Sequence, residues 1–533
     1  MEQEQNRWKI REKILQFFEK YNPAGPAKRE GDFLKRPETV LFIIYALLTF
    51  LMVFFHETWR DEAQGFLIVR DLSLPQLFAQ LHREVHFPVW YLLILPFVKL
   101  GIPVYGVNII HWILALVLVW LILEKFPFRL LTRSVLVFSF PLFFEFSVIA
   151  RNYTIGFLLL TIVFLLWKKL WERPVFTAFL LALCLLCDPF FVGIVSGLCI
   201  CIFFQAITQN RLKSREFILS VIIVSAAIVL DLILVCGFSS GSFSVPHPIE
   251  HAVSPVGNNI LQRLWRPFSI NSSLFGMSPV IMILLFFLTI FQLRHSREGV
   301  FIFVFSSLFT YVAFVLGGFD SMRHAAFFPA GGVAAFLIAG RGNVLVNKKL
   351  PEKSVTVLFF IFILWSAVFL LARSVSAFRN EILYDFSHGK YTADFINKNL
   401  PSSTVYCTAP VYYTPVFASL QHKRIFSLSM EKYITFSPWI SLRSPDLSRI
   451  PETVLKHLPA NEDHALYVSM IYDLPSKQAE NMYLLYSSLN ERAGAWAHPE
   501  ECYWVFLIVR PEKAHLFKDK FPLYDPSNYV LDK

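Results

Sequence analysis

Eleven apolar runs, most of them long enough to cross a membrane, constrain the fold of this chain more than any other feature. A spanning helix needs roughly 20 apolar residues, with a usual range of about 17–25. The runs lie at 38–56, 106–124, 131–149, 153–168, 174–188, 190–208, 217–237, 273–293, 299–316, 324–340 and 354–373. The chain is 55% hydrophobic and 17% charged, whereas soluble domains are about 45–50% apolar and about 25% charged. We therefore expect a polytopic α-helical membrane protein with about 11 transmembrane helices.

Clusters of basic residues orient these runs. The formal net charge of the 533-residue chain is +10, but its Lys and Arg residues gather in short segments between the apolar runs. That is the pattern of cytoplasmic loops and not of a nucleic-acid-binding surface. The clusters occupy 1–36, 125–133, 168–173, 211–215, 294–297 and 341–349. If all of them are cytoplasmic, the N-terminus lies inside, the C-terminus lies outside, and the loop after the first span faces outward.

A twelfth apolar stretch, residues 88–100, is short and contains Pro96. Segment 106–124 must run from outside to inside, because the basic cluster that follows it, 125–133, is cytoplasmic in this topology. That direction is consistent only if 88–100 does not cross the membrane. We therefore place 88–100 as a juxtamembrane helix within the outer loop 57–105.

Three polar regions then share the outer face, namely loop 57–105, loop 238–272 and the C-terminal tail. The expected division is a cytoplasmic segment at 1–37, a transmembrane domain at 38–373 and a small extracytoplasmic α/β domain at 374–533. The tail alternates strand-like and helical patterns. The strand-like runs are 403–408, 465–470 and 503–509, and the helical patterns are 391–400 and 476–489.

Two of the seven cysteines, Cys407 and Cys502, lie in this tail. An extracytoplasmic compartment permits disulfides, so these two could form one there. Cys184 and Cys187 have the spacing of half a metal motif, but apolar residues flank them and no second pair follows. We interpret them as buried membrane thiols.

The first outer loop carries an acidic pair, Asp61 and Glu62, almost immediately after the first span. Ser73–Gln76 has the form of a capping box, which predicts a helix that ends near Glu84. Two amphipathic surface helices would carry Asp61 and His86 along the membrane boundary toward one place. A carboxylate at that boundary is partly desolvated, which raises its pKa and its basicity, and a general base acting on an acceptor hydroxyl needs such a setting. The alternative is that these acids only solvate a loop.

Two arginine motifs are expected at the outer ends of spans, Ala150-Arg151-Asn152-Tyr153 and Arg323-His324. An arginine there can simply extend to the lipid headgroups, whereas its planar fork also matches the oxygens of a phosphate. The positive-inside rule makes arginine less expected on the outer face. We therefore favour phosphate binding for both motifs.

Loop 238–272 contains His247, Glu250 and His251, whose spacing matches no defined metal motif, so we interpret it as a loop that covers the substrate. Asp188 lies in an apolar run, where an ionisable residue is a functional candidate by default. It also precedes Pro189 at an outer turn, so the alternative is that it marks a helix boundary. The chain has no P-loop, no dinucleotide-binding glycine motif, no HExxH and no GxSxG. Nothing in it therefore indicates a nucleotide-powered pump or a transferase that uses a soluble nucleotide sugar.

Four motifs together carry a family resemblance that covers about residues 38–373. They are Trp59-Arg60-Asp61-Glu62-Ala63-Gln64, Glu84-Val85-His86-Phe87-Pro88-Val89-Trp90-Tyr91-Leu92-Leu93, Ala150-Arg151-Asn152-Tyr153 and Arg323-His324. In these runs the chain resembles bacterial membrane glycosyltransferases of the GT-C superfamily, in the branch of the protein O-mannosyltransferases and aminoarabinose transferases (glycosyltransferase family 39-like). The family often has Glu-Gly-His-Pro, and here Val85 and Phe87 replace the Gly and the Pro.

The resemblance implies an inverting glycosyltransferase that moves a hexosyl or pentosyl group from a polyprenyl-phosphate donor to a lipid, glycan or protein acceptor, with no nucleic acid involved. It implies Asp61 as the catalytic base with Glu62 beside it, Glu84 and His86 in the acceptor or metal region, and Arg151, Tyr153, Arg323 and His324 as the lipid-phosphate site. Some family members need a divalent metal and others do not, so the cofactor stays open.

The expected location is a bacterial inner membrane, with the active site facing the periplasm or the exterior. No nucleotide is available on that face, so the sugar must arrive on a lipid. The alternatives are a transporter or lipid-linked-glycan flippase without transferase activity, and an inactive scaffold. Transporters often show internal repeats and helices broken at the membrane midplane. This chain shows neither clearly, and its acids gather at one face.

Overall fold

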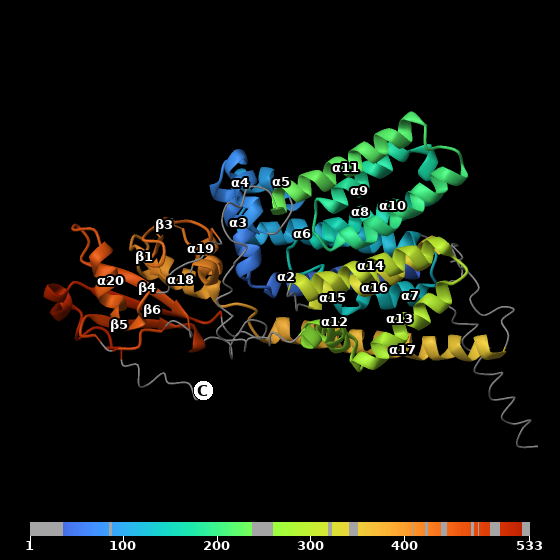
Figure 1. Cartoon of the computed structure of the whole chain (residues 1–533). Helices are drawn as coiled ribbons and strands as arrows, with labels where there is room; N and C mark the ends of the chain where they lie inside the picture. The colour runs from blue at the N-terminus through green and yellow to red at the C-terminus, as the bar shows by residue number, and fades with distance from the viewer. Residues whose placement is uncertain are drawn as a thin grey trace, which may run out of the picture.

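The computed structural model of the chain has a bundle of long helices at one end and a smaller, sheet-containing tail at the other (Figure 1). The structure describes residues 36–84, 88–236, 260–317, 322–339, 350–408, 410–421, 425–438, 445–470, 474–477, 479–490 and 501–524.

Within these ranges, eight helical segments are long and apolar enough to cross a membrane. They are Pro37–Phe55 (α2), Val104–Lys125 (α6), Tyr153–Glu172 (α8 with the 3-10 turn η3), Phe191–Thr208 (α10), Arg215–Ile233 (in α11), Arg297–Val315 (in α14), Met322–Ala339 (α15 and α16) and Ser354–Leu383 (in α17). Helices α12 (Ile260–Phe275) and α13 (Pro279–Leu293) meet at 88° and count as a ninth span if they are taken together. The chain is a multi-pass membrane protein.

Two of the eleven expected spans form helices that are shorter than a membrane crossing. The run 131–149 becomes α7 (Leu130–Phe138) followed by a π-helical turn, η2 (Pro141–Glu145). A proline lacks the amide hydrogen that continues a helix and restricts the residue before it, so α7 ends ahead of Pro141. The run 174–188 yields α9 (Pro174–Leu185), which stops before the Asp188-Pro189 turn.

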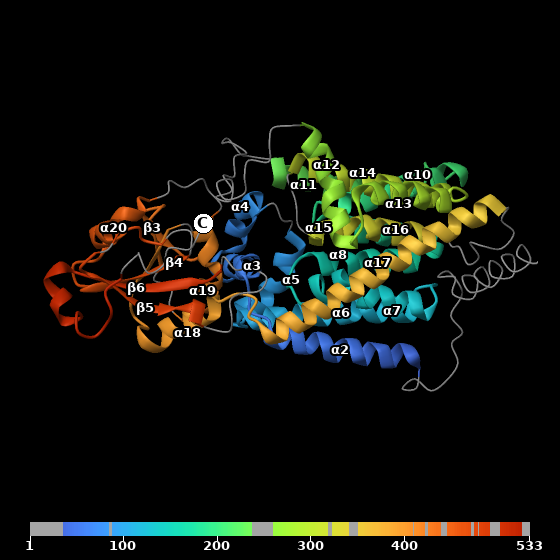
Figure 2. The same ribbon diagram turned by 90° about the horizontal axis from the view of Figure 1, so that it is seen from below.

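Helices α3 (Arg60–Asp71), α4 (Leu74–Glu84) and α5 (Pro88–Lys99) lie between the bundle and the tail (Figure 2). Helix α5 has 12 residues, about 18 Å at 1.5 Å per residue, which is short of the roughly 30 Å of a hydrocarbon core. One half of the predicted capping box is present, because Gln76 Oε1 accepts a hydrogen bond from the Ser73 amide at 3.0 Å. Helix α5 is not among the helices long enough to cross a membrane, and the placement of 88–100 beside the membrane stays a prediction.

The tail contains one six-stranded sheet in the order β3-β2-β1-β4-β6-β5. The strands are β1 (Val405–Cys407), β2 (Ile425–Ser427), β3 (Lys432–Ile434), β4 (His464–Met470), β5 (Met482–Ser487) and β6 (Tyr503–Val509). β1 runs parallel to β2 and β4, and the other neighbours are antiparallel. Helices α18 (Gly389–Asn399), α19 (Thr414–Ser419) and α20 (Ile450–His457) pack around it. The small α/β tail domain and its three predicted strands are confirmed.

The helix predicted at 476–489 is wrong, because this segment contains β5. Its run Met482–Ser487 pairs antiparallel with β6, with a bulge between Leu484 and Tyr486. The spacing of its apolar residues suits a helix as well as a strand, and pairing with the fully buried strand β6 decides the outcome.

The expected disulfide between Cys407 and Cys502 is also wrong, since both thiols are free and buried. Cys407 packs in the core that the sheet shares with α3 and α5, whereas Cys502 packs with α20 in a separate cluster. The two side chains therefore belong to different layers of the tail.

We expect both thiols to be alkylated when the purified chain is denatured with iodoacetamide and without reductant. Peptide mass spectrometry measures this directly. A Cys407–Cys502 cross-linked peptide in the non-reduced digest would contradict the packing described here.

Candidate functional site

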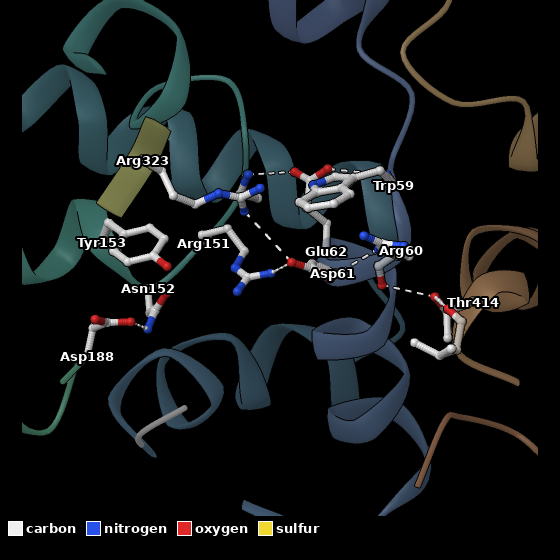
Figure 3. A network of polar contacts seen from close by, with 12 residues as sticks. Trp59, Arg60, Asp61, Glu62, Arg151, Asn152, Tyr153, Asp188, Arg323 and Thr414 are labelled. Atoms are coloured by element: carbon white, nitrogen blue, oxygen red, sulfur yellow. Dashed lines mark hydrogen bonds and ion pairs between the residues drawn. The ribbon is translucent and has the colours of Figure 1, made fainter. Parts of the chain in front are cut away.

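Asp61 lies in the first turn of α3, and three arginines from separate parts of the chain surround its carboxylate (Figure 3). Asp61 Oδ2 is 2.6 Å from Arg151 Nη1 and 3.8 Å from Arg323 Nη1. On the other side, Asp61 Oδ1 is 3.9 Å from Arg60 Nε. The Asp61 side chain keeps 24% of its surface exposed. The structure thus brings together the acid and both arginines that the sequence singled out.

Each arginine is held by its own surroundings. Arg151 is buried just before α8. Burial lowers the pKa of its guanidinium, but Asp61, with smaller contributions from Tyr153 and Tyr91, outweighs this and raises the pKa. The Arg323 guanidinium lies 4.7 Å from the ring centroid of buried Trp59, a cation–π contact. Arg60 lies over Trp59 and over Tyr412 of the tail. The site is therefore rich in fixed positive charge around one carboxylate.

A small cleft opens beside this charge cluster. It is lined by Asp61, Gly65, Trp90, Tyr91, Arg151 and Asn152. Trp90 and Tyr91 come from α5, so this short helix forms the aromatic wall of the cleft. Burial raises the pKa of Tyr91 well above its ordinary value, with Glu84 adding to the effect.

Glu62 points away from this cleft into the protein. Its Oε1 accepts a hydrogen bond from the Ala150 amide at 2.5 Å, and its Oε2 accepts from the Trp59 amide at 3.3 Å. The same Oε2 is 2.9 Å from His56 Nε2. Burial would raise the pKa of Glu62, but His56 and the hydrogen bonds from the Ala150 and Trp59 amides together outweigh it and lower the pKa. Glu62 is therefore arranged as an anchor and not as a second acid in the cleft.

Tyr153 and His324 join the segments that carry the two arginines. Tyr153 Oη is 2.9 Å from His324 Nε2, and the His324 ring stacks on Phe190 at 4.6 Å with an interplanar angle of 10°. Tyr153 follows Arg151 by two residues, and His324 follows Arg323 directly. The contact therefore fixes the two guanidinium groups relative to each other.

Asp188 connects the turn before α10 to Asn152, which lies between Arg151 and Tyr153. Its Oδ2 accepts a hydrogen bond from the Asn152 side chain at 3.0 Å, and its Oδ1 accepts from the Phe190 amide at 2.9 Å. Burial raises the pKa of Asp188 to about 6, although both hydrogen bonds lower it. The interpretation of Asp188 as a helix boundary is confirmed, because its carboxylate caps the turn just before α10.

Glu84 closes α4 and is held by two glutamine side chains, Gln64 at 3.0 Å and Gln80 at 2.8 Å. His86, the other residue of the predicted acceptor or metal region, lies outside the described residues, as do His247, Glu250 and His251. In the part of the chain that the structure describes, no three or more His, Cys, Asp or Glu side chains are grouped to hold a metal ion. The role of Glu84 stays a prediction.

The tail forms direct hydrogen bonds with α3. The Gln64 side chain donates to the carbonyl of Ser437 at 2.5 Å and accepts from its amide at 3.0 Å. The Arg60 amide donates to Glu501 at 3.2 Å, and the Arg60 carbonyl accepts from the Thr414 hydroxyl at 2.9 Å. The helix that bears Asp61 is therefore held by bundle and tail together.

Sequence reasoning missed His56 and Glu381, two buried residues beside this site. His56 follows α2 directly, and its Nδ1 is 2.6 Å from Glu381 Oε1 near the end of α17. Glu381 could have been found from the sequence, because it is an acid close behind a long apolar run. An ionisable side chain in such a place is usually paired with another polar side chain.

The bundle of long apolar helices, the short helices α3 to α5 beside the charged cleft and the small α/β tail together form a polytopic helical membrane fold with a C-terminal α/β domain. One solved structure with a similar fold is ArnT from Cupriavidus metallidurans bound to undecaprenyl phosphate, with a TM-score of 0.50 and 13% sequence identity over 89% of this chain and 98% of that one. The apo form of the same protein gives a TM-score of 0.49 at 10% identity, over 88% of this chain and 97% of that one. No protein-family model matches the sequence, and no curated protein matches it either. The fold expected from the resemblance is confirmed.

Proposed function

We propose that this chain is an inverting glycosyltransferase that moves a sugar from a polyprenyl-phosphate donor to an acceptor hydroxyl. The observation that carries the proposal is the partly exposed Asp61 carboxylate, which meets Arg151 at 2.6 Å and Arg323 at 3.8 Å at the edge of a cleft. A base beside two cations suits a reaction in which a hydroxyl loses a proton and a phosphate gains charge. The likeness of fold to a structure with bound undecaprenyl phosphate supports a lipid phosphate as the leaving group.

In the proposed reaction the donor phosphate binds Arg151 and Arg323, with Tyr153 and His324 holding the two guanidinium groups in place. The phosphate competes with Asp61 for the same nitrogens, so donor binding frees the carboxylate. Asp61 then takes the acceptor proton as the hydroxyl oxygen attacks the anomeric carbon from the face opposite the phosphate. The bond from the anomeric carbon to the phosphate oxygen breaks, and its electron pair stays on the phosphate, where the arginines stabilise it.

Glu62 enters this proposal as the residue that holds α3, because its oxygens are taken up by backbone amides and His56. Glu84, beside the cleft, is assigned to the acceptor region together with His86. We place the reaction on the periplasmic or exterior side of a bacterial inner membrane. The acceptor is a lipid, a glycan or a protein, and the sugar is a hexose or a pentose.

The test compares envelope glycolipids and glycoproteins from cells with and without the chain by mass spectrometry. We expect one sugar-bearing product to disappear with the chain. The product should reappear when the purified chain in lipid nanodiscs receives a polyprenyl-phosphate sugar and the unmodified acceptor. A flippase without transferase activity would instead move lipid-linked sugar across vesicles and leave every covalent product unchanged, and that result would contradict the proposal.

A further inference from the structure

His56 lies between two buried carboxylates that come from opposite ends of the membrane domain's sequence. Its Nε2 is 2.9 Å from Glu62 Oε2 at the start of α3, and its Nδ1 is 2.6 Å from Glu381 Oε1 in α17. The three side chains are buried almost completely. The Phe386 ring lies 4.6 Å from the imidazole and closes this contact. Both ring nitrogens are thus engaged by acids.

The position of Glu62 makes this contact relevant to the cleft. Glu62 directly follows Asp61, and its carboxylate accepts a hydrogen bond from Ala150, which directly precedes Arg151. It also accepts from Trp59, whose ring lies under Arg323. One carboxylate therefore sets the relative positions of the base and of both segments that are proposed to bind phosphate.

Two buried carboxylates cannot remain ionised side by side without a cation. Burial alone would lower the pKa of His56, but Glu62 and Glu381 outweigh it and raise the pKa well above 6.5. In the charged ring both nitrogens donate, which matches one acid on each side. Glu57 and His111 also interact electrostatically with this group. Burial raises the pKa of Glu57 to about 7, so Glu57 is only partly ionised at neutral pH and adds less than a full negative charge.

We infer that His56 is a positioning residue, which as an imidazolium between Glu381 and Glu62 holds the start of α3 so that Asp61 faces Arg151 and Arg323. The inference rests on the proposed function for its catalytic consequence, but the placement of α3 can be measured without it. His56 does not touch the cleft itself and acts only through Glu62. Loss of its charge removes the cation between Glu62 and Glu381, and the repulsion between the two carboxylates is then expected to weaken the hold of Glu62 on the amides of Ala150 and Trp59.

The variants are His56→Gln, Glu381→Gln and the double variant, with His464→Gln in β4 as the control. His464 is an imidazole that hydrogen-bonds to Ser403 at 3.1 Å in the tail, away from α3. A glutamine amide can donate from only one nitrogen, so His56→Gln loses both the charge and one contact. The double variant also removes the charge of Glu381, so Glu62 should regain a neutral hydrogen-bond partner and part of the loss should be recovered.

Hydrogen–deuterium exchange of the full chain in nanodiscs measures the placement of α3. In His56→Gln we expect faster exchange in peptides covering residues 57–71, unchanged exchange in β4 and β6, and partial recovery in the double variant. Faster exchange everywhere would indicate a general loss of stability and would overturn the inference. Unchanged exchange in α3 would overturn it as well. If His56→Gln does not fold, Glu381→Gln is read in the same way and with the same outcomes.

The second measurement is the kinetics of sugar transfer. We expect kcat per folded molecule to fall about 10–100-fold in His56→Gln with little change in KM for the donor, since a displacement of about 1 Å can cost that much. The control should keep both constants. An unchanged kcat in a folded His56→Gln would reject the positioning role. If the wild-type chain transfers no sugar at all, the proposed function fails, while the exchange experiment still decides whether His56 positions α3.

Discussion

Replacing Asp61 by Asn is expected to abolish sugar transfer while the chain stays folded and still binds its donor. Asparagine has nearly the same shape but cannot take a proton, and a general base contributes about 10²–10⁴-fold to a rate. The substitution also removes the carboxylate that now meets Arg151 at 2.6 Å. Because Asp61 competes with the donor phosphate for that guanidinium, the variant should bind the polyprenyl-phosphate donor at least as tightly as the wild type.

The measurement is single-turnover transfer at saturating donor, together with donor binding by equilibrium dialysis of a labelled polyprenyl phosphate. Asp71→Asn is the matched control. Asp71 lies at the other end of the same helix and pairs with Arg70 at 2.9 Å, outside the residues that line the cleft. We expect Asp71→Asn to transfer normally. Undiminished transfer by Asp61→Asn would remove Asp61 from the catalytic role, whatever happens to donor binding.

Replacing Arg151 by Gln is expected to reduce transfer about 10²–10³-fold, the usual cost of removing one group that stabilises charge in the transition state. Part of the loss should appear as a higher KM for the donor, because Arg151 is also the cation closest to Asp61. Arg151→Lys keeps the charge but loses the fork that fits two phosphate oxygens, so we expect an intermediate rate.

The same assay checks this prediction, with Arg70→Gln as the control. Arg70 forms an equivalent ion pair on α3 with Asp71, so it tests whether removing any guanidinium from this region slows the reaction. A loss of transfer that equals the loss in Arg70→Gln would point to stability instead of phosphate binding. The double variant Asp61→Asn/Arg151→Gln should be little slower than the worse single variant, because the two side chains act as one unit.

The membrane segments and the place of the site could be predicted because both follow from simple physical limits. The length of the apolar run and the distribution of Lys and Arg predicted that 88–100 lies outside the membrane, near the acidic loop. In the structure α5 forms a wall of the cleft. Arg151 and Arg323 were predicted to share a place with Asp61 because all three flank expected spans on one side. The structure has them within 4 Å of one carboxylate.

The different directions of Asp61 and Glu62 were missed because the segment was treated as a loop. Once α3 begins at Arg60, adjacent residues project to different sides of the helix, and both acids cannot face one cleft. The contacts around Glu62 could not be predicted from the sequence. Ala150 lies 88 positions from Glu62, and Glu381 lies 325 positions from His56, which connects it to Glu62. The strand β5 and the free thiols were missed for the same reason, because both depend on which layers pack together.

The contact between Gln64 and Ser437 does not depend on which side chain stands at position 437, unlike the neighbouring contacts of Arg60 with the side chains of Glu501 and Thr414. The Gln64 side-chain amide donates to the Ser437 carbonyl and accepts from the Ser437 amide, as the backbone of a neighbouring strand would. Any residue except proline, which lacks the amide hydrogen, offers the same pair. A substitution at position 437 by any residue other than proline is therefore expected to keep both hydrogen bonds to Gln64, provided that the backbone passes Gln64 at the same height.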